Sequence, residues 1–73
     1  MAVLKVLELL SDSSKSWEDA AEKATMKAAK SVKNIRSVYV QDMSAVVDAK
    51  GKIKTYRVTC KVTFEVGPTG KTN

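Results

Sequence analysis

Four polar residues with side chains suited to ligand binding sit at alternating positions of two stretches of the chain. Ser37, Tyr39 and Gln41 occupy every second position of one stretch, and Arg57 belongs to the other. If both stretches are strands of one sheet, these side chains share one face of it. Because a guanidinium binds phosphates and carboxylates through paired hydrogen bonds, this pattern predicts a site for an anionic ligand such as a nucleotide phosphate. The alternative is that Arg57 pairs with a glutamate of a neighbouring copy.

Two aspartates are candidates for binding a metal cation. Hard cations such as Ca²⁺ take about six to eight oxygen ligands, and one chain offers few at a suitable spacing. Copies of the same carboxylate converge at a symmetry axis of an oligomer, so Asp42 is the candidate metal ligand. Asp48 lies in a turn-like stretch and is expected to be a solvated turn residue.

The residue types needed for covalent catalysis are missing. The chain has no histidine and one cysteine, Cys60, so no imidazole is available to activate the thiol. Cys60 alternates with Val58 and Val62, which predicts a small hydrophobic side chain in the interior. The sequence also lacks a glycine-rich phosphate loop and a paired-carboxylate arrangement. We therefore predict that the chain is not an enzyme.

Hydrophobic periodicity divides the chain into four elements. Residues 2–10 are rich in leucine and β-branched residues, which predicts a strand with both faces at least partly covered. A helix of about 18 residues is expected to follow Ser16, whose hydroxyl can cap the backbone. Two long strands are expected over 37–47 and 55–66, joined by a hairpin turn at 48–51.

These elements predict an α+β fold of order β-α-β-β, with one helix packed on one face of a three-stranded antiparallel sheet. The helix stripe facing the sheet consists of residues three or four apart: Trp17, Ala20, Ala21, Ala24, Ala28, Val32 and Ile35. Because most of them are alanines, the helix can lie close to the sheet. Trp17 supplies bulk at one end, where packing is the expected role and a platform for a ligand is the alternative.

The 73 residues make one small domain, which we place at 1–66, followed by a flexible tail at 67–73. A second linker-like stretch lies at 11–15. Domains of this size usually need disulfides, a structural metal or oligomerisation, and a single cysteine without histidine leaves oligomerisation. One helix also cannot cover two strands that are longer than the typical five or six residues. We therefore expect copies of the chain to shelter one another.

The net charge of +5 raises the question of a polyanionic partner. A basic helix face could bind the phosphates of nucleic acid, but acidic residues share the helix and aromatic residues are scarce. A solvated surface is the favoured interpretation for these lysines: Lys23, Lys27, Lys30 and Lys33. No stretch approaches the roughly 20 apolar residues that span a bilayer, and no export signal is recognised. We expect a cytoplasmic protein without a membrane or nucleic-acid partner.

Three stretches of the sequence resemble the dodecin family: SWEDAAEKA in the helix, NIRSVYV at the start of the second strand and TYRVTCKVTFEV in the third. The resemblance extends over residues 3–66. It implies a hollow homododecamer that binds flavins in pairs near two-fold axes and stores or buffers them without catalysis. Some members of the family bind coenzyme A, and a subset binds metal ions.

Two positions depart from the flavin-binding pattern that this resemblance implies. The flavin-stacking tryptophan of the family is matched by Ser37, and a flavin-binding glutamine is matched by Arg57. Serine provides no aromatic plane, and arginine lacks the hydrogen-bond acceptor of an amide. We therefore expect a dodecin-like shell with a diverged site that takes flavin (FMN or riboflavin) or another cofactor such as coenzyme A. The alternative is a shell that binds a metal ion such as Ca²⁺ or is purely structural.

Overall fold

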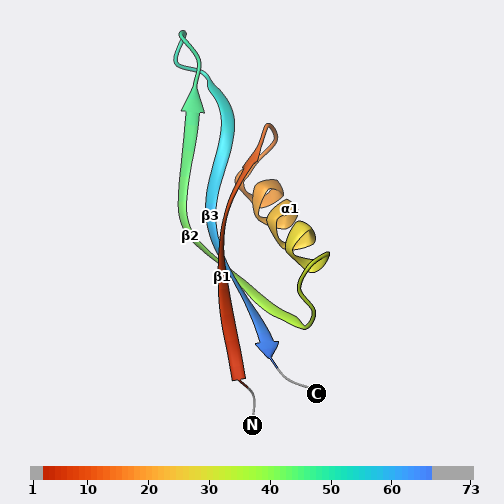
Figure 1. Cartoon of the computed structure of the whole chain (residues 1–73). Helices are drawn as coiled ribbons and strands as arrows, with labels where there is room; N and C mark the ends of the chain where they lie inside the picture. The colour runs from red at the N-terminus through yellow and green to blue at the C-terminus, as the bar shows by residue number, and fades with distance from the viewer. Residues whose placement is uncertain (1–2, 67–73) are drawn as a thin grey trace.

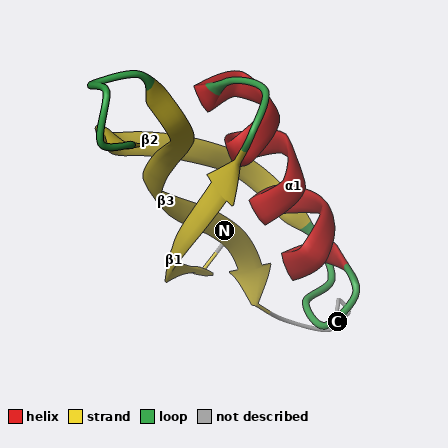
Figure 2. Ribbon diagram, turned by 90° about the horizontal axis from the view of Figure 1, so that it is seen from above, coloured by secondary structure: helices red, strands yellow, loops and turns green. Residues whose placement is uncertain are grey.

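The computed structural model of the chain describes residues 3–66 (Figure 1). Its elements are β1 (Val3–Ser13), α1 (Trp17–Ala29), β2 (Ile35–Val47) and β3 (Ile53–Val66). The sheet is antiparallel and α1 lies on one of its faces (Figure 2), so the predicted β-α-β-β fold is confirmed. Ala2, the first residue of the predicted first strand, and the predicted flexible tail at 67–73 lie outside the described residues.

β3 is the central strand of the sheet, in the order β1-β3-β2. Cys60 of β3 lies opposite Leu9 of β1 and Val40 of β2. Because β3 has a neighbour on each side and the helix above it, its helix-facing residues Val58, Cys60 and Val62 are fully buried. The strict alternation of apolar and polar residues along this strand produces that pattern.

The core between α1 and the sheet is built from small side chains. Ala20, Ala24 and Ala28 are the buried residues of the helix, and Ala20 and Ala24 pack against Val58 and Cys60. The predicted inward position of Cys60 is confirmed, and burial raises the pKa of its thiol. The thiol is therefore protonated at neutral pH and acts as part of the core.

The helix begins as predicted but is shorter than predicted. Ser16 caps it by accepting a hydrogen bond of 2.9 Å from the backbone N–H of Asp19. The helix contains 13 residues and ends at Ala29, so the expectation of about 18 residues reaching Ile35 was wrong. Asn34 adopts a φ of 64°, which an α-helix does not allow, and Ile35 starts β2 instead.

The first strand is longer than predicted, because part of the linker-like stretch at 11–15 belongs to it. β1 continues to Ser13, and Ser11 and Asp12 lie opposite Val58 and Arg57 of β3. Ser13 is buried, and its hydroxyl donates a hydrogen bond of 2.6 Å to a carboxylate oxygen of Asp19. Pairing with β3 and the hydrogen bond of Ser13 therefore extend the strand beyond its apolar residues.

The helix covers the sheet unevenly. It packs mainly on β1 and β3, and the helix-facing residues Val40 and Met43 of β2 remain exposed. The β2–β3 hairpin also extends past the start of the helix (Figure 1). Its turn spans the predicted residues, with Gly51 at a φ of 83°. The helix-facing surface of β2 and the tip of the hairpin are therefore left uncovered by the helix.

Candidate functional site

The sheet face opposite the helix, here called the outer face, carries most of the polar residues predicted to bind a ligand. Ser37 of β2 lies opposite Thr63 of β3, and Tyr39 lies opposite Lys61. Directly opposed residues of antiparallel strands point to the same face, so Ser37 and Tyr39 share the outer face. The side chain of Tyr39 is an exposed aromatic surface there, with a relative accessibility of 62%.

Arg57 lies on the same outer face but at its other end. It is opposite Ser44 of β2, whereas Ser37 is opposite Thr63. Six residues of β3 separate the two positions, which corresponds to about 20 Å along the strand. A single chain therefore does not bring Arg57 into contact with Ser37 or Tyr39.

A bulge interrupts β2 between these two ends. The pairing register shifts between Val40 and Asp42, so Gln41 has no opposite residue in β3. As a result Asp42, rather than Gln41, is opposite Thr59 on the outer face. A bulge redirects side chains in this way, and here it adds a carboxylate to the middle of the outer face.

Arg57 is paired within its own chain. Its Nε and Nη2 donate hydrogen bonds of 2.7 and 3.0 Å to the two carboxylate oxygens of Asp12. These hydrogen bonds hold the pKa of Asp12 below its usual range and raise that of Arg57. Asp12 was not predicted from the sequence as part of the site. Its position could have been found, because Asp12 continues the alternation that places Glu8 and Leu10 on the outer face. The guanidinium is thus held in a fixed orientation on the sheet.

The two candidate metal ligands lie in different surroundings. Asp48 belongs to the hairpin turn, where one carboxylate oxygen accepts hydrogen bonds from the backbone N–H groups of Lys50 (2.9 Å) and Lys52 (3.0 Å). Asp42 is exposed on the outer face. Within residues 3–66, no three histidine, cysteine or acidic residues come together as a metal cluster.

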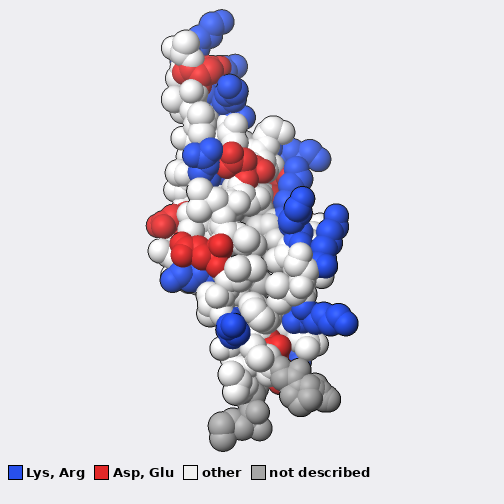
Figure 3. Space-filling view, in the orientation of Figure 1, with Lys and Arg blue, Asp and Glu red and all other residues white. Residues whose placement is uncertain are grey.

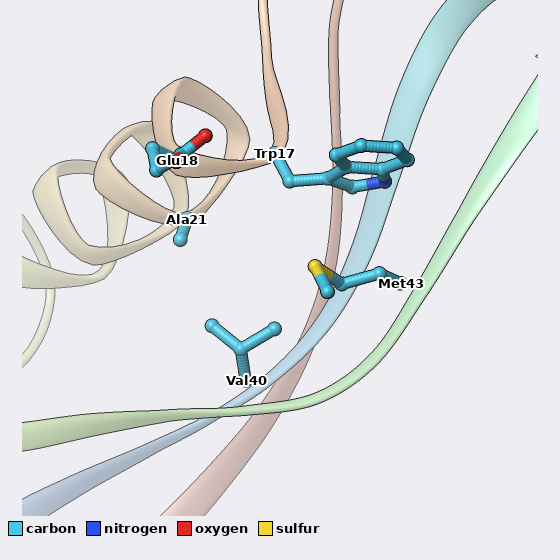
Figure 4. A pocket seen from close by; sticks show the side chains of 5 residues that line it. All are labelled: Trp17, Glu18, Ala21, Val40 and Met43. Carbon is cyan, nitrogen blue, oxygen red and sulfur yellow. The ribbon is translucent and has the colours of Figure 1, made fainter.

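A second candidate site is a cleft on the helix side of the sheet, between the start of α1 and β2. It has a volume of about 500 Å³ and is lined by Trp17, Glu18, Ala21, Val40 and Met43. The side chains of Val40 and Met43 point from β2 toward the helix (Figure 4). Such a volume is within the usual range for ligand pockets, so this cleft can admit apolar groups.

Trp17 closes one end of the cleft, and several contacts fix its ring. The indole Nε1 donates a hydrogen bond of 2.8 Å to the backbone carbonyl of Ser44. The ring also packs edge-on against Tyr56, with 4.9 Å between centroids and 79° between planes. Trp17 therefore both packs on the sheet and offers a surface to the cleft.

Basic side chains gather over the helix and at the hairpin tip (Figure 3). On the helix, Lys23 is 3.2 Å from Asp19, and Glu18 and Glu22 share its surface. This mixture of charges fits the predicted solvated surface. The helix of the described chain is too short and too polar to cross a membrane.

The model of the family described as Dodecin matches residues 3–67. The chain is 41% identical over 68 residues to calcium dodecin of Mycobacterium tuberculosis, covering 93% of this chain and 94% of the relative.

Solved structures show the same fold. A Thermus thermophilus dodecin variant has a TM-score of 0.83 at 26% identity, covering 90% of this chain and 97% of that one. The calcium dodecin structure from M. tuberculosis, which has a calcium-binding site, has a TM-score of 0.76 at 40% identity, covering 92% and 94%. From the family match over almost its whole length, we conclude that the chain belongs to the dodecin family.

Proposed function

We propose that copies of this chain assemble into a closed homododecameric shell that binds a small ligand or ion where subunits meet. The observation that carries this proposal is the imbalance between buried and exposed apolar residues. Among residues 3–66, the buried hydrophobic core has six residues, three of them alanine, while fourteen large hydrophobic side chains are exposed. Exposed apolar surface on this scale marks contacts with other proteins.

The apolar residues that need cover lie on both sides of the sheet. Leu4, Val6 and Leu10 of the edge strand β1 are exposed on the outer face, and Met43 is exposed on the helix face. A dimer through one face would leave the other face uncovered, so a closed particle accounts for both. Analytical ultracentrifugation should give a mass of about twelve times 8.0 kDa. A stable monomer at micromolar concentration would contradict the proposal.

Calcium is the first candidate ligand. The calcium dodecin relative supports it, at 41% identity over 93% of this chain. Asp42 suits such a site because its carboxylate is exposed on the outer face and, among the described residues, forms no ion pair. Around a symmetry axis, repeated carboxylates, backbone carbonyls and water would supply the oxygen ligands that one chain lacks.

Calorimetry of the assembled protein with CaCl₂, against a chelator-treated blank, tests this assignment. The variant Asp42→Asn should weaken calcium binding at least tenfold, since it removes the charge that would hold the cation. Glu22→Gln is the matched control, because Glu22 is an exposed carboxylate on α1, away from the outer face. Unchanged binding by Asp42→Asn would remove Asp42 from the site, and no heat with the unmodified protein would rule out calcium binding.

An organic anion such as a flavin or coenzyme A is the second candidate ligand. Exposed Tyr39 supports it, since its ring can stack on a planar group. Ser37 lies about 20 Å from Arg57 within one chain. Two outer faces in antiparallel apposition would bring Ser37 and Tyr39 of one copy toward Arg57 of another, with Gln41 at the neighbouring bulge. Arg57 keeps Nη1 free of Asp12 to contact the ligand.

Quenching of FMN fluorescence by micromolar protein tests flavin binding. If the missing aromatic plane limits affinity, Ser37→Trp should bind FMN at least tenfold more tightly than the unmodified chain. Thr63→Trp, opposite Ser37 on the same face, is the control for added apolar surface. No quenching by either the unmodified chain or Ser37→Trp would eliminate flavin as the ligand while leaving the assembly intact.

We also propose that the protein acts in the cytoplasm and without catalysis. Cys60 supports both points. Its thiol is buried and unpaired within the described chain, as expected in a reducing compartment. The raised pKa of the thiol also makes it a poor nucleophile at neutral pH.

A further inference from the structure

The cleft beside Trp17 combines an apolar floor with an acidic rim. Trp17, Ala21, Val40 and Met43 form its walls, and among residues 3–66 Glu18 is the only charged residue that lines it. Met43 has a relative accessibility of 63%. Within the described residues, Glu18 forms no ion pair. The cleft therefore suits an occupant that is apolar at its centre and basic at its edge.

The tip of the β2–β3 hairpin has those properties. Val47 and Ile53 lie opposite each other, with relative accessibilities of 55% and 47%. Three lysines surround this pair: Lys50, Lys52 and Lys54. Asp48, the acidic residue of the turn, accepts hydrogen bonds from the backbone N–H groups of Lys50 and Lys52. Figure 3 shows the basic groups at this end of the molecule.

A chain cannot place its own hairpin tip in its own cleft. Met43 lines the cleft and Val47 belongs to the tip, and both are residues of the continuous strand β2. Four residues of extended strand hold them about 13 Å apart. The hairpin also points away from the helix (Figure 1). Any contact between the two surfaces must therefore join different copies.

We propose that the hairpin tip of one copy docks in the Trp17 cleft of the next. Val47 and Ile53 pack against Trp17 and Met43, and Lys52 and Lys54, which flank Ile53, face Glu18. The pairing covers the part of β2 that α1 leaves exposed and neutralises charge at the rim. This inference rests on the proposed self-assembly, and it specifies which surfaces of neighbouring copies meet.

This contact is heterologous, because a tip meets a cleft and not another tip. Heterologous contacts build rings when their rotation closes. A closed shell needs such a ring in addition to any two-fold contact between like surfaces. The hairpin would thus act as the connecting arm around one axis of the particle.

A charge exchange tests the contact. Glu18→Lys alone and the pair Lys52→Glu with Lys54→Glu should each raise the concentration for half-assembly by about tenfold or more at low salt, because like charges then face each other. The chain carrying all three substitutions should regain most of the assembly. Glu22→Lys is the control, since it changes the same charge on the same helix but does not line the cleft. Equal assembly of all variants would overturn the proposal.

Fluorescence of Trp17, the single tryptophan of the chain, provides a second measurement. Dilution of the unmodified protein below its assembly concentration should shift the emission to longer wavelength as water enters the cleft. Emission that stays constant while the particle dissociates would refute docking there. A small apolar probe that changes the Trp17 emission without changing the particle mass would also refute it, because the cleft would then be open in the assembled particle. An unmodified chain that is monomeric would instead contradict the proposed function itself.

Discussion

Replacing Ala24 by leucine tests whether the alanine surface of α1 sets its distance from the sheet. Ala24 is 5% exposed and packs in the cluster with Val58 and Cys60. Leucine adds three carbon atoms to a side chain that packs against buried residues of the sheet, and such overpacking costs about 1–3 kcal/mol. Each kcal/mol lowers the melting temperature of a domain of this size by roughly 4–8 °C. We therefore expect Ala24→Leu to lower it by about 5–20 °C.

Ala29→Leu is the matched control for this prediction. It makes the same substitution in the same helix, at the exposed last residue, where the added side chain does not enter the core. We expect a change within about 0.5 kcal/mol. Both variants should be melted by circular dichroism at one fixed protein concentration, because assembly makes apparent stability depend on concentration. Equal melting temperatures would refute close helix–sheet packing as the basis of the core.

Three further predictions concern the cleft, the turn and the capping network. Trp17→Phe removes the hydrogen bond to Ser44 and should cost about 1 kcal/mol in chemical unfolding; an unaltered midpoint would show that this hydrogen bond is not stabilising. Gly51→Ala should cost about 1–2 kcal/mol, because the φ of 83° strains any residue with a Cβ, and Gly51→Asn should recover part of it. The pKa of Asp19 is lowered by hydrogen bonds from Ser13 and Lys23, so its stabilisation is present above the ordinary carboxyl pKa of about 3.9. That stabilisation should be lost as pH falls below this value, and Asp19→Asn should flatten the acid limb of the stability profile. A parallel acid limb in both proteins would contradict the assignment.

Local patterns in the sequence predicted the elements but not all of their ends. The Ser16 cap and the alternation around Cys60 located the helix start and the central strand. The helix end was placed too late because Val32 and Ile35 continue the helical spacing, whereas Asn34 takes a left-handed conformation. The end of β1 at Ser13 depends on pairing with β3, which no local pattern reveals.

The outer face shows both what could and what could not be predicted. Counting back along both strands from the turn at 48–51 would have placed Ser37 near Thr63, far from Arg57. The separation of the two ends of the site was therefore available from the sequence. The bulge at Gln41 was not, because the alternation of Ser37, Tyr39 and Gln41 is regular and a bulge depends on the partner strand.

The small core and the divided polar site have the same structural origin. A 13-residue helix lies beside strands of 13 and 14 residues, so apolar surface is left exposed while Ser37 and Arg57 sit far apart along the sheet. Packing against another copy would cover the exposed apolar surface and would also bring the two ends of the polar site together. A ligand that binds only across such a junction stabilises the assembled state by RT ln(1 + [L]/Kd), so the stabilisation grows with the logarithm of the ligand concentration. Ligand binding and assembly are then thermodynamically linked, so each must change the apparent affinity of the other by the same factor.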